Sequence, residues 1–309
     1  MSVKVNIRGQ AAAPGSLAHA LKDVKLKLVT ISGKGGVGKS LVTASIAVGF
    51  AMRGYKVGIL DGDVYGPTIP KMLGVSDSTL YVDQKTGKII PVVGPLGIKV
   101  VSIEFALPSD DTAVIWRAPL VNQALRDFIA QVEWGSLDVL VVDLPPGTGD
   151  APLTIAQSLQ GGLDGSVIVT IPTEISRRIV LKSIDFSRKL NIRVAGVVEN
   201  MCCFKCPDNG KVYYIFGRDA GKKIAEAAGV PFLGGIPIDP QFSQHLDTGR
   251  LHEFLAKDSE TAKAVLSIVN ALEEMYKDKL SQQTQPKEEK PKRISLLKLP
   301  GEEEEEGEN

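Results

Sequence analysis

Residues 33–40 read Gly33-Lys34-Gly35-Gly36-Val37-Gly38-Lys39-Ser40, between an alternating apolar segment and a long helical pattern. This stretch fits the phosphate-loop pattern G-x-x-x-x-G-K-[ST] in the required strand–loop–helix context. Glycines let backbone N–H groups approach phosphate oxygens, and the following helix N-terminus adds partial positive charge. We therefore expect a nucleotide site in which Lys39 reaches the β- and γ-phosphates and the Ser40 hydroxyl ligates Mg²⁺.

Lys34 adds a feature beyond the general pattern, because a second lysine stands five residues before Lys39. This arrangement resembles the deviant Walker A signature K-G-G-x-G-K-[ST] of MinD-like P-loop ATPases. The resemblance implies that Lys34 reaches across a dimer interface to the nucleotide of the partner subunit. The alternative is a solvated surface lysine.

Short apolar runs alternate with helical patterns on both sides of this loop. The alternation predicts βαβ crossovers, and so an α/β fold with a mostly parallel central sheet and helices on both faces. The expected strands are Leu26–Ser32, Lys56–Leu60, Lys99–Ile103, Leu137–Val142, Gly165–Ile171, Ile192–Val198 and Phe232–Ile236. The expected helices are Ser40–Arg53, Leu120–Val132, Ile175–Leu190, Ala220–Ala228 and Ser259–Tyr276. Ligands of such sheets bind beyond the carboxyl ends of the strands.

Acidic residues follow two of the expected strands. Asp61 and Asp63 come directly after the run 56–60, and Asp143 ends the apolar run 139–142. Carboxylates near a phosphate loop can order the hydration shell of Mg²⁺ and the attacking water. Phosphoryl transfer requires mainly such positioning and the neutralisation of charge. We expect Asp143 to hold Mg²⁺ through a water molecule. A pair of aspartates in a turn is also a common structural cap, so residues 61–63 alone leave both interpretations open.

Composition bounds the class of protein. The 309 residues carry 36 basic and 36 acidic side chains, which gives no charge excess for nucleic acid or membrane binding. We predict a variable lead-in at residues 1–24, a P-loop ATPase domain at 25–276 and a disordered charged tail at 277–309, which holds 7 basic and 9 acidic residues. No window has the roughly 18 apolar residues of a membrane helix. We expect a cytoplasmic protein with reduced thiols.

All three cysteines stand within five residues, at Cys202, Cys203 and Cys206, after the expected strand 192–198. Cys203 and Cys206 form a C-x-x-C, a spacing that lets two thiolates bind one metal centre. Iron–sulfur clusters take four cysteine ligands, so one chain cannot complete such a site alone. Two chains giving two cysteines each would complete it. A redox dithiol, half of a zinc site or a non-functional arrangement remain alternatives.

These segments together resemble the Mrp/ApbC family of iron–sulfur cluster carrier ATPases, within the MinD-like class. The resemblance covers about residues 25–275. The segments that carry it are Gly33–Ser40, Asp61–Pro70, Trp116–Pro119, Asp143–Asp150, Glu199–Met201, Tyr214–Gly217 and Ile236–Asp239.

This resemblance implies an ATP-dependent homodimer that binds a [4Fe–4S] cluster between its subunits and passes it to recipient apoproteins. Cluster donors are implied as further partners, and neither nucleic acid nor a membrane is expected. Asn200 and Pro237 are implied to contact the adenine, although a strand-end turn would also explain them. Asp63 matches the aspartate that hydrolysis requires.

One departure from the family pattern concerns the cysteines. The family usually has C-P-x-C, with cysteines at positions 206 and 209, and this chain has Asn209 at the second position. Cys203 restores a C-x-x-C in shifted register, and Cys202 offers a less favourable C-x₃-C. Two other functions compete: a MinD- or ParA-like positioning or partition ATPase, and a nucleotide sensor that uses the C-x-x-C as a redox switch. The acidic run Glu302–Glu306 argues against the positioning ATPase, which calls for a basic amphipathic helix or basic face.

Overall fold

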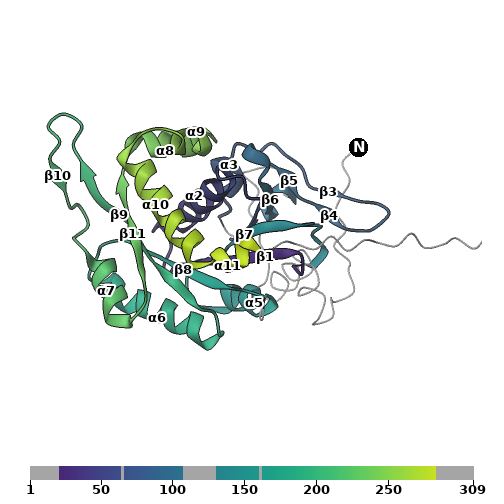
Figure 1. Ribbon diagram of the computed structural model, residues 1–309, viewed down its shortest axis with the longest axis horizontal. Coiled ribbons are helices and arrows are strands. Elements are labelled where there is room, and N and C mark those ends of the chain that lie inside the picture. Colours follow the sequence, from purple (N-terminus) through teal and green to yellow (C-terminus); the bar gives the residue numbers. More distant parts are fainter. Residues whose placement is uncertain (1–20, 64–65, 107–129, 160–161, 283–309) are drawn as a thin grey trace, which may run out of the picture.

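A computed structural model describes residues 21–63, 66–106, 130–159 and 162–282 (Figure 1). Within them, nine strands form one twisted sheet in the order β10-β9-β8-β1-β7-β2-β6-β5, and β11 pairs with β9. The pairs in the centre of the sheet are parallel, and only β5 with β6 and β10 with β9 are antiparallel. The strands are β1 (Val24–Ile31), β2 (Val57–Asp61), β5 (Val92–Val93), β6 (Lys99–Ser102), β7 (Leu137–Asp143), β8 (Gly165–Thr170), β9 (Val194–Lys205), β10 (Val212–Tyr213) and β11 (Phe232–Ile238).

Helices cover both faces of this sheet. Figure 1 shows α2 and α10 along its upper side and α5, α6 and α7 along its lower side. The described helices are α2 (Lys39–Ala51), α3 (Ile69–Met72), α5 (Asp150–Ser158), α6 (Ser176–Lys189), α7 (Ala220–Ala228), α8 (Pro240–Asp247), α9 (Leu251–Leu255), α10 (Glu260–Met275) and α11 (Lys277–Ser281). A separate ribbon of β3 (Tyr81–Val82) and β4 (Ile89–Ile90) projects at one end of the molecule. The predicted α/β fold, with a mostly parallel sheet between two helical layers, is confirmed.

The central strands are buried on both faces, which explains why they read as continuous apolar runs. In β7, for example, every residue except Asp138 is buried. The register then brings three strand ends together, because Asp143 lies opposite Thr30 of β1 and opposite Asp61 of β2. The phosphate loop follows β1 directly, so residues that the sequence assigns to the nucleotide site meet at this end of the sheet.

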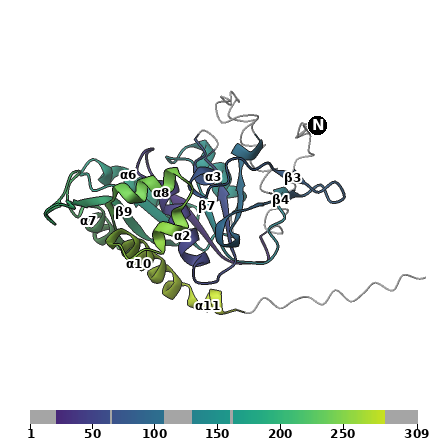
Figure 2. The same ribbon diagram turned by 90° about the horizontal axis from the view of Figure 1, so that it is seen from above.

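Two predicted boundaries are wrong. Strand β9 does not end at Val198 but continues to Lys205, because β10 and β11 pair with its extension, so Cys202 and Cys203 lie in a strand rather than in a loop after it. Residues 277–281, predicted as the start of the tail, form α11, because Leu280 is buried on the core. Figure 2 shows α11 directly after α10. Trp116–Pro119 and most of the expected helix 120–132 lie outside the described residues, as do 1–20 and 283–309.

Candidate functional site

The phosphate loop turns from β1 into α2 through two glycines with left-handed backbone. Gly36 has φ 76° and Gly38 has φ 82°, a region that glycine adopts without steric cost. A Cβ atom at Gly38 would also lie 2.1 Å from Nδ2 of Asn200. The glycine at position 38 is therefore required twice, by the backbone turn and by the packing of the loop against β9.

Lys39 and Ser40, the first two residues of α2, meet Asp143 at the end of β7. Lys39 Nζ lies 2.6 Å from Asp143 Oδ2, and the Ser40 hydroxyl donates to the same oxygen at 2.5 Å. Lys39 is 6% exposed and Asp143 is fully buried, so this is an ion pair in a low-dielectric environment. A second carboxylate, Asp63 Oδ2, lies 3.9 Å from Lys39 Nζ. The structure thus brings together four residues that the sequence assigned to one site.

Two threonines complete the environment of Asp143, and neither was predicted from the sequence. The hydroxyls of Thr30 and Thr43 donate to Asp143 Oδ1 at 3.0 and 2.7 Å. Thr43 lies one helical turn after Lys39, on the same face of α2. The only sequence signal was a hydroxyl residue in an otherwise apolar stretch of strand or helix. These bonds satisfy the carboxylate oxygen that Lys39 does not touch.

Asp61 brings a third carboxylate to the site and is buried. The Ser102 hydroxyl lies 3.2 Å from its Oδ2, and the Asp63 amide donates to its Oδ1 at 3.2 Å. Burial, and secondly the neighbouring carboxylate of Asp143, raise the pKa of Asp61 from 3.8 to about 8, against the opposing effect of Lys39. One ammonium therefore faces three carboxyl groups, and the site has a surplus of acidic oxygen atoms.

This donor set fits Mg²⁺, which prefers carboxylate, hydroxyl and phosphate oxygens and keeps several of its waters. Ser40 and Asp143 already touch, so they are the protein groups that would hold the ion. Within the described part of the chain, no group of three or more His, Cys, Asp or Glu residues forms a ready metal cage.

Asn200 links the phosphate loop to the cysteine-bearing strand. It lies inside β9 and is buried, and its Nδ2 donates to the Val37 backbone oxygen at 2.9 Å. It is therefore not the strand-end turn residue that the sequence left as an alternative. Pro237, the other implied adenine contact, follows Ile236, which pairs with Asn200 across the β9–β11 ladder. Both residues stand at the same end of the sheet as the phosphate loop.

Strand β9 bulges directly after Asn200. Asn200 pairs with Ile236 and Phe204 pairs with Ile238, so three residues of β9 oppose only Pro237 of β11. Proline has no N–H to give to the ladder, and Met201 takes up the change of direction with φ 56°. The bulge places the thiols of Cys202 and Cys203 next to each other, with their Sγ atoms 3.4 Å apart. We call residues 201–203 the cysteine bulge.

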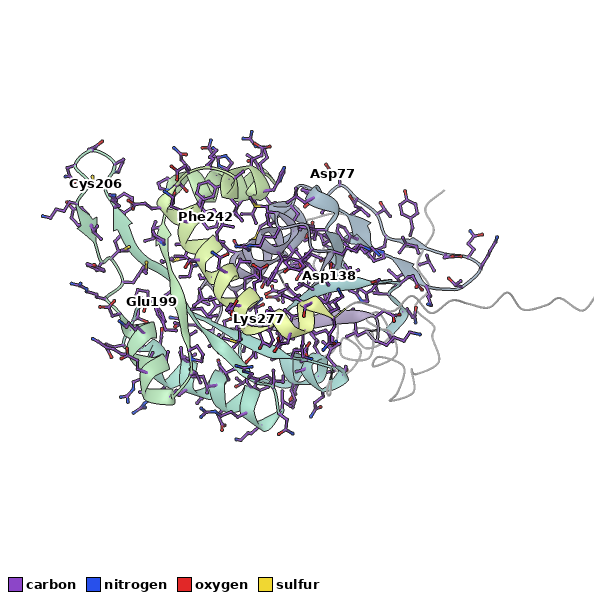
Figure 3. The ribbon with its side chains drawn as sticks, in the orientation of Figure 1. Asp77, Asp138, Glu199, Cys206, Phe242 and Lys277 are labelled. Carbon is purple, nitrogen blue, oxygen red and sulfur yellow. The ribbon has the colours of Figure 1, made fainter. Side chains whose placement is uncertain are left out.

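Cys206 lies beyond this bulge, in the turn between β9 and β10. Its amide donates to Lys211 O at 2.9 Å, and its carbonyl accepts from the Gly210 amide at 2.9 Å. Figure 3 shows Cys206 at the tip of the projecting hairpin. The structure therefore pairs Cys202 with Cys203, and it does not gather the three cysteines of this chain into one metal-holding group.

Burial affects two further groups near the bulge. Burial, and then the hydrogen bond with Cys203, raise the pKa of the Cys202 thiol to about 12. Glu199 is buried one residue before Asn200, and its carboxylate accepts from the Gly221 amide at the start of α7 at 2.5 Å. Burial raises the pKa of Glu199 although this hydrogen bond opposes the shift. Glu199 thus joins β9 to α7, a role that was not predicted from the sequence.

Comparison with known protein families identifies relatives of this chain. The family model described as ParA, NUBPL iron-transfer P-loop NTPase, matches residues 23–273. The chain belongs to this family. A relative from Saccharolobus solfataricus named iron-sulfur cluster carrier protein is 51% identical over 250 residues, which cover 81% of this chain and 83% of the relative. A relative of the same name from Aquifex aeolicus is 46% identical over 84% of this chain and 70% of its own length.

Solved structures agree with the NUBPL family assignment. A nucleotide-binding protein from Archaeoglobus fulgidus, in complex with ADP, is 37% identical with a TM-score of 0.70, over 81% of this chain and 96% of that one. The cell division ATPase MinD of Pyrococcus furiosus has a TM-score of 0.57 at 21% identity, over 81% of this chain and 99% of that one. The likeness to MinD shows the fold alone. The resemblance inferred from the sequence motifs is confirmed at the level of the family.

Proposed function

We propose that this protein is a Mg²⁺-dependent ATPase that carries a [4Fe–4S] cluster at a homodimer interface and transfers it to recipient apoproteins. The observation that carries the proposal is the hydrogen bond from Asn200 to Val37. It connects the phosphate loop to the strand that bears the cysteines, within one residue of the cysteine bulge. The names of the relatives in Saccharolobus solfataricus and Aquifex aeolicus support the same cargo.

ATP binding begins with a change of partner for Lys39. In this structure its ammonium lies against Asp143, and the β- and γ-phosphates would draw it away. Asp143 and Ser40 would hold Mg²⁺, and a bound Mg²⁺ would supply charge neutralisation for the transferred phosphoryl group. Asp63, 3.9 Å from Lys39, orients the attacking water. Gly147 and Gly149, in the loop after β7, let that loop follow the γ-phosphate state.

In the proposed dimer, each subunit provides a lysine and cluster ligands that a single subunit lacks. Lys34 reaches across the interface to the nucleotide of the partner subunit, where its charge stabilises the transition state. Four thiolates complete a [4Fe–4S] cluster, and each subunit gives two of them, Cys203 and Cys206. ATP draws the subunits together and hydrolysis loosens them. The affinity for the cluster changes during this cycle, because Asn200 couples the phosphate loop to β9.

The positioning or partition ATPase is the less supported alternative. The relatives at 46–51% identity are named as carriers, whereas the MinD protein from Pyrococcus furiosus is 21% identical and speaks only for the fold. None of the described helices is long and apolar enough to cross a membrane. The third alternative, a nucleotide sensor without hydrolysis, does not explain why Lys39, Asp63 and Asp143 are all present in one site.

Anaerobic reconstitution of the full chain with iron and sulfide tests the proposal. We expect the wild type to gain the absorbance of one [4Fe–4S] cluster per dimer, and the Cys203→Ser and Cys206→Ser variants to lose it. Asp208→Ser, in the same hairpin turn, is the matched control and should keep full uptake. Cluster absorbance that survives both cysteine substitutions removes the site assignment. Stoichiometric zinc without any cluster uptake refutes the carrier function itself.

Transfer needs a second measurement. The loaded protein is mixed with a [4Fe–4S]-dependent apoenzyme, and the activity of that enzyme is followed over time. We expect activation to be faster when Mg²⁺ and ATP are present than without nucleotide. Equal transfer rates under both conditions would mean that hydrolysis serves another purpose.

A further inference from the structure

Two neighbouring thiols face each other in the cysteine bulge. The Sγ atoms of Cys202 and Cys203 are 3.4 Å apart, and both side chains are half-buried. Successive side chains of a regular strand point to opposite faces of the sheet, so this contact needs a local irregularity. The bulge opposite Pro237 supplies it, with the left-handed Met201 at its start.

The packing of β11 restricts where the Cys202 thiol can go. A Cβ atom built at Gly235 would lie 3.0 Å from Cys202 Sγ. The backbone of β11 therefore closes one side of this thiol, and Cys203 stands on another. Since Gly235 leaves just enough room for the sulfur, the close approach of the two thiols is built into the pairing of β9 with β11.

The pair does not have the ligands of a metal site. Thiolate sites for soft metal ions use three or four ligands, and no third His, Cys, Asp or Glu of the described residues joins these two. Two thiols alone are sufficient for a different reaction, which is oxidation to a disulfide.

We propose that Cys202 and Cys203 are a reversible redox pair that closes to a vicinal disulfide, and that closure withdraws Cys203 from cluster binding. The second half of this statement rests on the proposed function, in which Cys203 is a cluster ligand. The first half concerns the thiols alone and stands without it.

Hydrogen peroxide is the oxidant with which the step balances. One thiolate attacks the O–O bond, an S–O bond forms, and the departing hydroxide leaves as water, which produces a sulfenic acid. The second sulfur then attacks the sulfenic sulfur, the S–S bond forms, the S–O bond breaks, and a second water leaves. Two thiols lose two electrons and two protons in total, and one peroxide is reduced to two waters. A dithiol reductant reverses the step by thiol–disulfide exchange.

Reversibility follows from the chain geometry. Disulfide-linked Cα atoms usually lie about 4.4–6.8 Å apart, whereas neighbouring Cα atoms across a trans peptide lie about 3.8 Å apart. A vicinal disulfide is therefore strained, and strained disulfides are reduced more easily than structural ones. The bond is suited to a switch and poorly suited to permanent stabilisation.

The test uses the full apo-chain, first reduced and then given one equivalent of hydrogen peroxide under argon. Arg193 precedes β9 and Lys205 ends it, so trypsin releases peptide 194–205 with both bulge cysteines, and Cys206 falls in the next peptide. We expect the number of titratable thiols to drop from three to one, and peptide 194–205 to lose two hydrogens. Cys206→Ser should retain this change, whereas Cys202→Ser and Cys203→Ser should each abolish it.

The other outcomes overturn the proposal. A disulfide that links peptide 194–205 to the peptide of Cys206, a disulfide between two chains, or sulfinic acid without a disulfide excludes the vicinal pair. Cluster uptake is measured on the same oxidised sample, and we expect it to be absent until dithiothreitol is added. Unchanged uptake by the vicinal disulfide form refutes the switch. If the reduced protein takes up no cluster, the proposed function fails, and the peptide map still decides whether the redox pair exists.

Discussion

The ammonium of Lys39 and the carboxylate of Asp143 form a buried ion pair, with Nζ 2.6 Å from Oδ2. One residue opens α2 and the other ends β7, so the pair joins the phosphate loop to the neighbouring strand of the sheet. Burying two charges is costly, and removing one partner leaves the other uncompensated. Without nucleotide, Lys39 therefore has a structural role in addition to the role in phosphate binding that its motif predicts.

Replacing Lys39 should consequently reduce stability as well as binding. In Lys39→Met, Asp143 loses its counter-ion, and we expect the free energy of unfolding to fall by about 3–5 kcal/mol, with ADP binding lost. The double variant Lys39→Met/Asp143→Asn should recover most of the stability without recovering binding. Lys189→Ala, which breaks the exposed pair with Asp185, is the control and should unfold like the wild type. Urea denaturation at pH 7 measures all four proteins, and an unchanged unfolding midpoint for Lys39→Met would contradict the structural role.

Asp61 should give stability a dependence on pH opposite to that of an ordinary carboxylate. Its pKa is raised by burial to about 8 from 3.8, so the folded state binds its proton more tightly than the unfolded state does. This contribution is complete below pH 4 and is lost as the pH rises toward 8. Relative to Asp61→Asn, the wild type should lose stability from pH 5 to pH 8, by at most about 1.4 kcal/mol per pH unit.

Asp138→Asn is the matched control for this measurement. In Asp138, hydrogen bonds from Lys25 and the Lys56 amide outweigh the effect of burial and lower the pKa, so the group is ionised in both states above pH 5. Its difference from the wild type should stay constant from pH 5 to pH 8. If the Asp61→Asn difference is equally flat, Asp61 is ionised in the folded protein and the expected linkage is absent.

The sequence predicted those parts of the site whose chemistry is local. Lys39, Ser40 and Asp143 were expected in one site, and their side chains are in contact, because the phosphate loop and the strand end each form from neighbouring residues. Thr30 and Thr43 were missed, since a buried hydroxyl becomes a ligand of Asp143 only through the register of β1 with β7. The cysteine bulge depends on Pro237, which lies opposite residues more than thirty positions earlier in the chain, and no local pattern in residues 199–206 reveals it.

Gly38 and Gly35 should respond differently to the same substitution. Gly38→Ala places a Cβ atom 2.1 Å from Asn200 Nδ2 on a backbone with φ 82°, and we expect a loss of about 1–3 kcal/mol in the nucleotide-free protein. A Cβ atom at Gly35 meets nothing within 4 Å and its φ is not left-handed, so Gly35→Ala should leave stability unchanged. Thermal unfolding of both variants compares them, and equal melting temperatures would mean that the loop relaxes at no cost.

Lys34 should separate nucleotide binding from turnover. If its charge acts on the nucleotide of the partner subunit, Lys34→Ala should keep the ADP affinity of the wild type but lower ATP turnover by about a hundredfold or more, as removal of a trans-acting cation does elsewhere. Lys222→Ala, on the exposed face of α7, controls for loss of a surface charge. Phosphate release and light scattering with a non-hydrolysable ATP analogue are the measurements. If Lys34→Ala keeps full ATP turnover, Lys34 is a solvated surface lysine that takes no part in hydrolysis.

Asn200 should couple nucleotide binding to the reactivity of the cysteines in β9. Its amide donates to Val37 and its backbone leads directly into Met201 at the bulge. We therefore expect a ligand that moves the phosphate loop to displace the strand that carries Cys202 and Cys203. We expect nucleotide to change the alkylation rate of Cys203, read from peptide 194–205, on the order of fivefold in the wild type. In Asn200→Ala the change should vanish while nucleotide still binds.

The control for this last experiment is Asn270→Ala, which removes an amide that contacts Arg53 on the surface and should leave the nucleotide effect intact. Binding of ATP and GTP to the same proteins separates coupling from adenine recognition. If Asn200 serves only the adenine, Asn200→Ala alters the preference for ATP over GTP but keeps the response of Cys203 at saturating nucleotide. Loss of that response with an unchanged base preference assigns Asn200 to coupling, because a residue that merely stabilised β9 would change the alkylation rate equally with and without nucleotide.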